Sequence, residues 1–286
     1  MAMGITTNGG RVAALGVLAV LALTACARQA VAPEQPAAPA QAKPQQVTIA
    51  AGDGWEVTGL DTLKAGWVTI TFNTLQGEGD HGLEVVRFKQ DVSIEQLLST
   101  EDPEEFLEMA EPLGGFVGIT GAESHTITLE LEAGSYGMVD FGGTEEGPNF
   151  ARGMTATFEV TQGDGTAGIR PASDGEIVMR EFAIELPDGF TGQGTYLVRN
   201  TGGLIHELNI GRVPPGIDPI EELKRHAETG RGRMTEVPGL AMIGPGREAY
   251  LELNLTQGPY VFACFFSGGP EGVHALQGMY APVTVG

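Results

Sequence analysis

Sulfur and imidazole side chains gather close to the C-terminus of this 286-residue chain. From Cys264 to Met279 the sequence reads CFFSGGPEGVHALQGM, so a thiol, the imidazole of His274 and a thioether share one Gly-rich segment. A second imidazole, His206, lies upstream in the segment NTGGLIHELN. Two nitrogens, one thiolate and a weakly bound thioether are the ligands of a trigonal copper site with a long axial Met. The pattern therefore predicts one copper ion held by His206, Cys264, His274 and Met279.

Each of these side chains also has a purely structural interpretation when it is considered alone. Cys264 could be a buried thiol, His206 a hydrogen-bonded histidine at a strand start, and Met279 a core residue. Their combination in this order favours a metal site, and soft sulfur ligands select copper over magnesium or calcium. Zinc also accepts one Cys and two His, but its fourth ligand is more often a carboxylate or water than a Met.

The elements that must position these ligands belong to an internal repeat. The first copy comprises residues 47–162 and the second residues 176–286, and residues 163–175 form a linker by composition. Three pairs of segments match in order: HGLEVV (81–86) with HELNI (206–210), TITLEL (126–131) with YLELNL (250–255), and GMTATFEV (153–160) with GMYAPVTV (278–285).

Alternating apolar and polar residues in these segments predict half-buried strands. A helical insert is expected in each copy, at residues 92–109 and 218–227. Copies of about 110 residues with several short strands predict an all-β fold, namely two tandem Greek-key β-sandwiches that each carry one short helical insert.

With these ligands on this repeat, the chain resembles the cupredoxins, the small blue-copper β-sandwich proteins. The resemblance covers both copies, but its specific motif covers only the second. It implies one type 1 copper ion bound by His206, Cys264, His274 and Met279, and His274 near the surface for contact with a partner. The chain departs from the family at two places. The loop of nine residues between Cys264 and His274 is long for a small cupredoxin. Glu207 stands where many family members have Asn after the first His, which puts in question the hydrogen bond from this position to the Cys loop.

The first copy lacks the full ligand set. Asp140 stands where Cys264 stands, and Asn149 stands roughly where His274 stands, so that only His81 and Met154 remain. Without a thiolate or a second His a type 1 site cannot form. Residues 47–162 are therefore predicted to be a degenerate cupredoxin-like domain without copper, and residues 176–286 the copper-binding domain.

The N-terminal residues predict export and anchoring. Residues 1–25 contain Arg11 followed by an apolar run too short for a comfortable membrane span, which is typical of a signal peptide. The tetrapeptide LTAC ending at Cys26 resembles a bacterial lipobox, so Cys26 is predicted to be lipidated. The Pro/Ala/Gln-rich residues 26–46 then form a disordered tether. Because Cys26 is assigned to lipid, Cys264 is left without a partner for an intrachain disulfide, which favours a ligand role.

Net charge limits the partners. The formal charge is −21, from 37 acidic and 16 basic residues, so nucleic-acid binding is not expected because phosphates would be repelled. The expected partners are an unidentified redox protein and, through the lipid anchor, a membrane. The location is expected to be extracytoplasmic, in the periplasm or at the cell surface.

Three functions compete for this sequence. The first is a lipid-anchored type 1 copper protein that transfers single electrons. The second is a copper oxidase or nitrite reductase, but such enzymes need further His ligands and the chain has five His, so the protein is predicted not to be an enzyme. The third is copper storage or delivery, or a metal-free cupredoxin-like binding module.

Overall fold

Strands with alternating burial dominate the computed structural model, which describes residues 43–52, 54–75, 79–89, 92–100, 103–163, 170–268 and 272–286. The predicted signal peptide, the lipidation at Cys26 and most of the predicted tether lie outside the described residues. The tether is shorter than predicted at its C-terminal end, because the first strand, β1, begins at Gln45. Among the described residues, the helices are all too short or too polar to cross a membrane.

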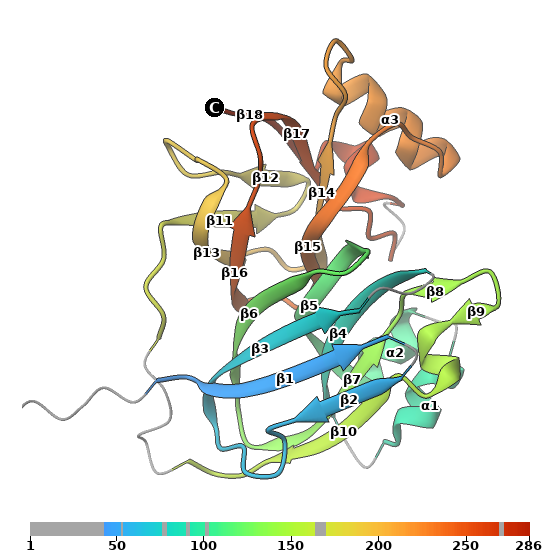
Figure 1. Ribbon diagram of the computed structural model, residues 1–286, viewed down its shortest axis with the longest axis vertical. Helices are drawn as coiled ribbons and strands as arrows, with labels where there is room; N and C mark the ends of the chain where they lie inside the picture. Colours follow the sequence, from blue (N-terminus) through green and yellow to red (C-terminus); the bar gives the residue numbers. More distant parts are fainter. Residues whose placement is uncertain are drawn as a thin grey trace, which may run out of the picture. The chain divides into compact units, whose positions relative to one another are not determined.

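The described strands form two eight-stranded sheets, which confirms the predicted all-β fold (Figure 1). In spatial order, the strands of the first sheet are β12 (Ala183–Glu185), β11 (Gly175–Arg180), β13 (Gln193–Asn200), β16 (Glu248–Asn254), β6 (Ser124–Leu131), β3 (Gly66–Thr74), β1 (Gln45–Ala51) and β2 (Trp55–Thr58). Those of the second are β10 (Thr155–Val160), β7 (Gly134–Asp140), β4 (Asp80–Phe88), β5 (Ala110–Thr120), β15 (Thr235–Ile243), β14 (His206–Arg212), β17 (Gly258–Ala263) and β18 (Tyr280–Val285).

Short helices and one small ribbon connect the strands. They are α1 (Ile94–Ser99), α2 (Pro103–Met109), α3 (Pro219–Thr229), the 3₁₀ turns η1 (Asn149–Arg152) and η2 (His274–Gln277), and the pair β8 (Gly143–Thr144) and β9 (Gly147–Pro148). The insert predicted at residues 92–109 thus contains two helices instead of one. A capping box formed by Ser93 and Gln96 starts α1, and the Asp218 side chain caps α3.

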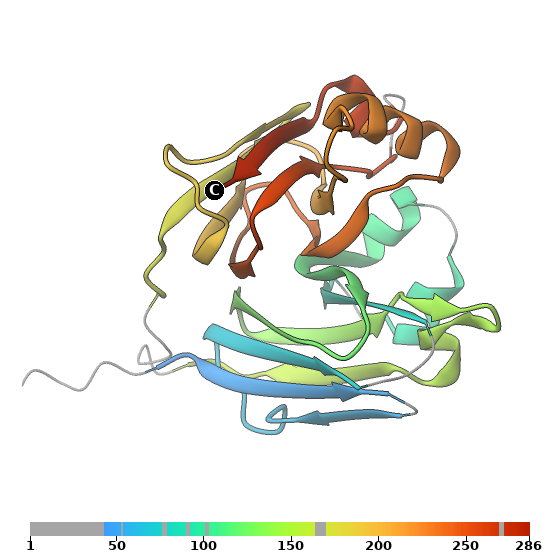
Figure 2. The same ribbon diagram turned by 45° about the horizontal axis from the view of Figure 1, so that its top comes forward.

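Within the described part of the chain, each copy contributes four strands to each sheet, and both sheets continue from one copy into the other. Strand β5 pairs with β15, and β6 pairs with β16, both antiparallel. In Figure 2 the blue-to-green strands of the first copy accordingly lie beside the orange and red strands of the second. We call this junction the seam.

Equivalent residues of the two copies meet at the seam. Phe116 of β5 pairs with Leu240 of β15 across the seam. Within its own copy, Phe116 pairs with Leu83 of β4, and Leu240 pairs in the same way with Leu208 of β14. In the other sheet Ile127 pairs with its counterpart Leu251. Self-matching of this kind is the mark of an isologous, twofold interface between identical subunits. The seam is therefore a pseudo-twofold interface inside one chain.

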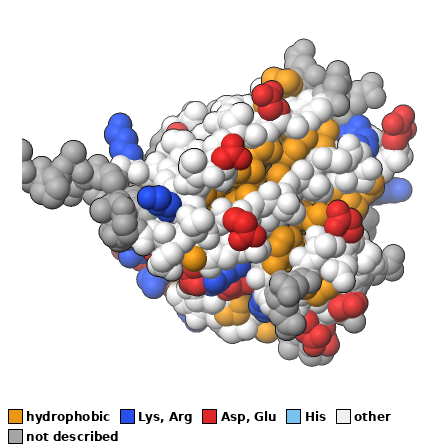
Figure 3. Space-filling view, turned by 90° about the horizontal axis from the view of Figure 1, so that it is seen from below, with side chains coloured by type: hydrophobic (Ala, Val, Ile, Leu, Met, Phe, Trp, Pro, Cys, Tyr) orange, Lys and Arg blue, Asp and Glu red, His pale blue; other side chains and the backbone are white. Residues whose placement is uncertain are grey.

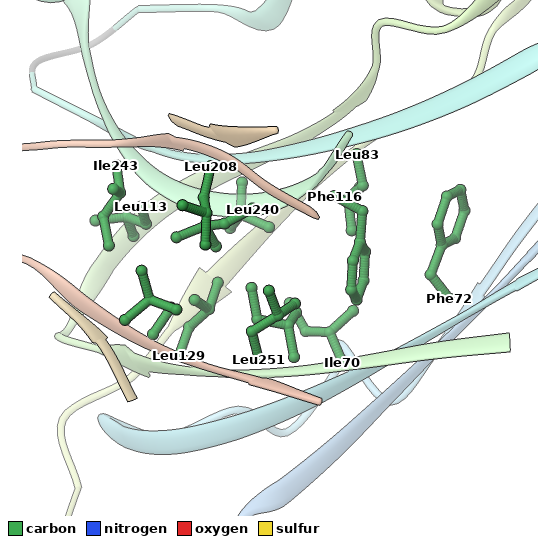
Figure 4. Close-up of a cluster of buried hydrophobic side chains, with 14 of the residues drawn as sticks. Ile70, Phe72, Leu83, Leu113, Phe116, Leu129, Leu208, Leu240, Ile243 and Leu251 are labelled. Carbon is green, nitrogen blue, oxygen red and sulfur yellow. The ribbon is translucent and has the colours of Figure 1, made fainter. Parts of the chain in front are cut away.

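One continuous apolar core fills the space between the sheets across the seam. Leu83, Phe116 and Leu129 from the first copy lie beside Leu208, Leu240 and Leu251 from the second (Figure 4). Hydrophobic side chains also form a band on the face of the molecule that is seen from below (Figure 3). Trp55 and Val57 of β2 are only partly buried against the core.

Polar cross-links also join the copies. The Glu84 carboxylate, 2% exposed, accepts a hydrogen bond from Met242 N of the second copy at 2.9 Å and from Gly114 N at 3.4 Å. Burial raises the pKa of Glu84 well above its ordinary value, although these N–H groups oppose the shift. Nearer the surface, Arg247 binds both oxygens of Glu111 at 2.7 and 2.9 Å. The seam is thus fixed by hydrogen bonds as well as by packing.

Substituting Leu240 tests whether the copies unfold together. Leu240→Ala, in the second copy, is expected to lower the free energy of unfolding by about 3 kcal/mol, because it opens a cavity at a fully buried site. Both tryptophans belong to the first copy, but the Trp67 ring packs against Tyr250 of the second copy, whereas Trp55 packs against Phe72 of its own copy. Urea unfolding in a Trp67→Phe background, followed by the fluorescence of Trp55, therefore reports the first copy.

The control is Leu276→Ala, a leucine of the second copy that is 40% exposed and whose loss should change the free energy by less than about 0.5 kcal/mol. An unchanged tryptophan transition in Leu240→Ala would contradict a single cooperative unit.

Candidate metal centre

The chain brings three of the predicted ligands together from three elements. His206 is the first residue of β14, Cys264 follows the end of β17, and His274 is the first residue of η2. Antiparallel pairing of β14 with β17 places the first two close together. The long loop then returns to the sheet, where Ala275 N donates to Cys264 O at 2.7 Å and holds η2 against the cysteine.

The three ligand atoms form a small triangle. His206 Nδ1 lies 3.2 Å from His274 Nδ1, and Cys264 Sγ lies 4.0 Å from the first nitrogen and 3.5 Å from the second. All three residues are fully buried. Since each of these atoms has a lone pair available for coordination, the group could hold one metal ion.

The size of this triangle fits a metal. A point equidistant from the three atoms lies about 2.1 Å from each, which is close to metal–nitrogen bonds of about 2.0–2.1 Å and metal–sulfur bonds of about 2.3 Å. All three angles of the triangle are acute, so that point lies inside the triangle. The donor atoms therefore already stand in a trigonal arrangement around one position.

Met279, the predicted fourth ligand, is tied to the site through its backbone. Cys264 N donates to Met279 O at 3.2 Å, and Met279 N donates to His274 O at 3.1 Å. Gly278, with φ of 108°, ends η2 in a left-handed conformation that suits glycine and turns the chain towards β18. The Met279 side chain is fully buried in the apolar cluster that also contains Cys264. Its role as an axial ligand stays a prediction.

Burial sets the protonation of the metal-free site. Burial, and then the neighbouring His274, lower the pKa of His206 to about 4, so this imidazole is neutral at neutral pH. Burial, and then the charge of Glu207, raise the pKa of the Cys264 thiol to about 12. A metal ion must therefore displace the thiol proton, which its positive charge favours.

Aromatic rings cover His274, so the imidazole is not exposed for the direct contact with a partner that the resemblance implied. The imidazole is fully buried, with the Phe182 and Phe266 rings 5.4 and 5.6 Å away between centroids. Phe182 was not recognised from the sequence, because it lies in the turn between β11 and β12, far from the ligands along the chain. Its φ of 57° is unusual for a residue other than glycine, asparagine or aspartate.

Glu207 makes the hydrogen bond to the Cys loop that the sequence put in question. Its Oε1 accepts from Phe265 N at 3.0 Å and from Asn209 Nδ2 at 2.7 Å. The backbone N–H of Glu207 also points at Cys264 Sγ, 3.4 Å away. The carboxylate of Glu207 thus accepts the hydrogen bond from the Cys loop that an Asn amide was expected to accept, and it fixes the backbone beside Cys264.

The first copy keeps the same arrangement with different side chains. His81 Nδ1 lies 2.6 Å from Asp140 Oδ2, and Asn149 Nδ2 lies 3.3 Å from the same imidazole nitrogen. Asp140 Oδ1 accepts from Gly82 N at 2.9 Å, just as Cys264 Sγ faces the N–H of the residue after His206. The structure thus places Asp140 and Asn149 at the positions of Cys264 and His274. Asp140 and Asn149 both contact His81 there, and the absence of copper from this copy stays a prediction.

The backbone repeats this correspondence. Asp140 N donates to Met154 O at 3.1 Å, and Met154 N donates to Asn149 O at 3.2 Å, within 0.1 Å of the matching bonds in the second copy. The turn η1 also ends at a left-handed glycine, Gly153, with φ of 88°. The scaffold of the site therefore survives in the first copy, although the ligands differ.

Comparisons with known proteins give distant likenesses. No family model and no curated protein matches the chain. Among solved structures, auracyanin from the photosynthetic bacterium Roseiflexus castenholzii is 24% identical, over 39% of this chain and 95% of that chain, with a TM-score of 0.28. Rusticyanin, described as a copper protein, is 19% identical over 42% and 79% of the two chains, with a TM-score of 0.30. At such TM-scores these likenesses carry no argument about function.

Other matches correct one prediction from the sequence. Multicopper oxidases also stand among the matched structures, one of them covering 84% of this chain and 88% of its own. The prediction that the protein is not an enzyme is therefore wrong as stated, because a small number of histidines does not exclude one. With 13% identity and a TM-score of 0.22, the match does not establish an activity either.

The lowered pKa of His206 predicts how the metal-free protein responds to acid. Its stability is expected to fall as the pH decreases from about 6.5 to about 4, because unfolded His206 takes up a proton that the folded imidazole excludes. Urea unfolding across this pH range measures the effect, with His206→Asn as the comparison. The pKa values of Glu84 and Glu207 are raised and act in the opposite direction, but equally in both proteins. Identical pH slopes in the two proteins would contradict the prediction.

Restoring the missing ligands tests the correspondence between the copies. Asp140→Cys with Asn149→His is expected to add a second metal site to the first copy, because the backbone there already matches. Copper content per chain after loading and desalting measures the gain. Asp140→Ser with Asn149→His, which lacks the thiolate, is the matched control. A folded double variant that binds no more copper than the wild type would show that the correspondence is not functional.

Proposed function

We propose that this protein binds one type 1 copper ion through His206, Cys264 and His274, with Met279 as axial ligand, and transfers single electrons. The observation that carries the proposal is the buried triangle of two Nδ1 atoms and one Sγ, whose size suits a single ion. Thiolate and imidazole together favour copper among the common metals. Copper in such a site supplies one-electron chemistry by alternating between two oxidation states.

The residues around the triangle support electron transfer because they restrict movement. Cys264 is held by β17 and by its backbone bonds to Met279 and Ala275. The bond from Phe265 N to Glu207 fixes the loop beyond it, and two aromatic rings confine the imidazole of His274. Ligands held this firmly rearrange little when the charge on the metal changes. Small rearrangement makes electron exchange fast.

Burial favours electron transfer over copper delivery. A delivery protein must let its ion leave by ligand exchange with a partner, which requires at least one accessible ligand. Here His206, Cys264 and His274 are all fully buried. Electrons can cross a covering side chain, whereas a metal ion can exchange with a partner only when the covering side chains move aside. Burial of all three ligands therefore supports electron transfer better than storage or delivery.

We further propose an extracytoplasmic, lipid-anchored location and a protein redox partner. The motif ending at Cys26 and the polar tether after it support the anchor. The net charge of −21 supports a partner with a basic docking surface and argues against nucleic acid.

Colour tests the copper proposal directly. Cu(II)-loaded protein is expected to absorb strongly in the visible range through thiolate-to-copper charge transfer, and to give the paramagnetic-resonance spectrum of a type 1 site. Cys264→Ser is expected to abolish the colour. Cys26→Ser removes the other thiol of the chain and should keep it. A wild-type protein that binds Cu(II) but stays colourless would defeat the proposal.

Cell fractionation tests the anchor. The wild-type chain, expressed in a bacterium that processes lipoproteins, is expected in the membrane fraction. Cys26→Ser should move it to the soluble fraction or leave the precursor unprocessed, whereas Cys264→Ser should stay with the membrane. If both variants fractionate like the wild type, Cys26 is not the anchoring residue.

A further inference from the structure

A cleft lies at the seam, next to the candidate metal centre. Its volume is about 450 Å³, within the range of about 300–1,000 Å³ that small-molecule sites occupy. The first copy forms one wall with Leu107 of α2 and Pro112 of β5. The second copy forms the other wall with Ile205, Pro245 and Phe266. Neither copy alone would make this cleft.

Two residues connect the cleft to the metal ligands. The Phe266 ring lines the cleft and also packs against the imidazole of His274, with 5.6 Å between ring centroids. Ile205 lines the cleft and directly precedes His206. Both imidazoles are fully buried, so a redox partner cannot touch them. The Phe266 ring would separate a molecule in the cleft from the imidazole of His274.

The lining specifies the kind of molecule. Its walls are mainly aliphatic and aromatic, which suits a flat apolar body placed against Phe266. Lys89 lies at the exposed rim, where Nζ donates to Leu107 O at 2.6 Å and keeps further N–H donors for an oxygen of a ligand. The Glu111 carboxylate, also at the cleft, is already paired with Arg247 through two bonds. Glu104 also lines the cleft, so the lining carries two carboxylates and the ammonium group of Lys89 beside the apolar walls.

We propose that this cleft binds a small planar aromatic molecule with a hydroxyl or carbonyl oxygen at one edge, of the phenol or quinol class, and that electrons enter the metal centre there. The electron step rests on the proposed function. A bound quinol gives one electron to Cu(II), which becomes Cu(I). Its hydroxyl proton passes to water at the open mouth of the cleft, and the neutral radical leaves. The first copy, without a ligand set of its own, then serves as one wall of the binding site.

Binding to the metal-free full chain tests the cleft independently of copper. The probe is 1,4-dimethoxybenzene, which has the shape of a quinol but no proton to lose, and ligand-observed NMR titration measures its affinity. Leu107→Glu, which places a carboxylate in the apolar wall, is expected to weaken binding by about tenfold or more. Leu75→Glu is the matched control, because Leu75 is 57% exposed and does not line the cleft. Absent binding, or equal loss in both variants, would overturn the proposal.

Reduction of the Cu(II)-loaded protein by 1,4-hydroquinone tests electron entry. The rate, followed by bleaching of the visible band, is expected to saturate with hydroquinone in the wild type and in Leu75→Glu. In Leu107→Glu it should fall by about tenfold while copper content and spectrum stay unchanged. An equal rate in both variants would overturn the entry role. If the chain takes up no copper but binds dimethoxybenzene in the cleft, the proposed function fails and the entry role fails with it, whereas the aromatic site is supported.

Discussion

The structure depends on keeping one thiol and two imidazoles within 4.0 Å of one another and away from water. Polar groups buried in this way are costly unless something satisfies them. One cation at the centre of the triangle would be coordinated by all three groups at once. Strand β17, the turn η2 and the carboxylate of Glu207 hold the groups in this costly arrangement.

The seam supplies the stability that such a site requires. Both sheets and the apolar core continue from one copy into the other, so packing in the first copy supports the ligands of the second. In the first copy, Asp140 accepts hydrogen bonds from His81 and from Gly82 N at the equivalent position. In the first copy a carboxylate thus accepts hydrogen bonds from its neighbours, whereas in the second copy a thiol and two imidazoles form a group that could hold one metal ion.

The sequence predicted local features well and long-range ones poorly. Ligand types and spacing were enough to bring Cys264 together with its two His residues, and repeat alignment placed Asp140 and Asn149 correctly. Alternating burial predicts that a strand has a core face, but it does not say which strand lies beside it, so the pairing of β5 with β15 was not foreseen. The covering of His274 by Phe182 depends on a turn distant in the chain, which no spacing reveals. Counting His residues was too weak a basis for excluding an enzyme.

The self-matching seam has one more consequence. If the two copies were separate, identical subunits joined by an interface of this kind, they would dissociate on dilution, because the association of subunits depends on their concentration. Here the halves belong to one polypeptide, and each stays at a fixed, high effective concentration relative to the other. A pseudo-dimer of this kind keeps its shared core at any dilution, even when only a few molecules are present.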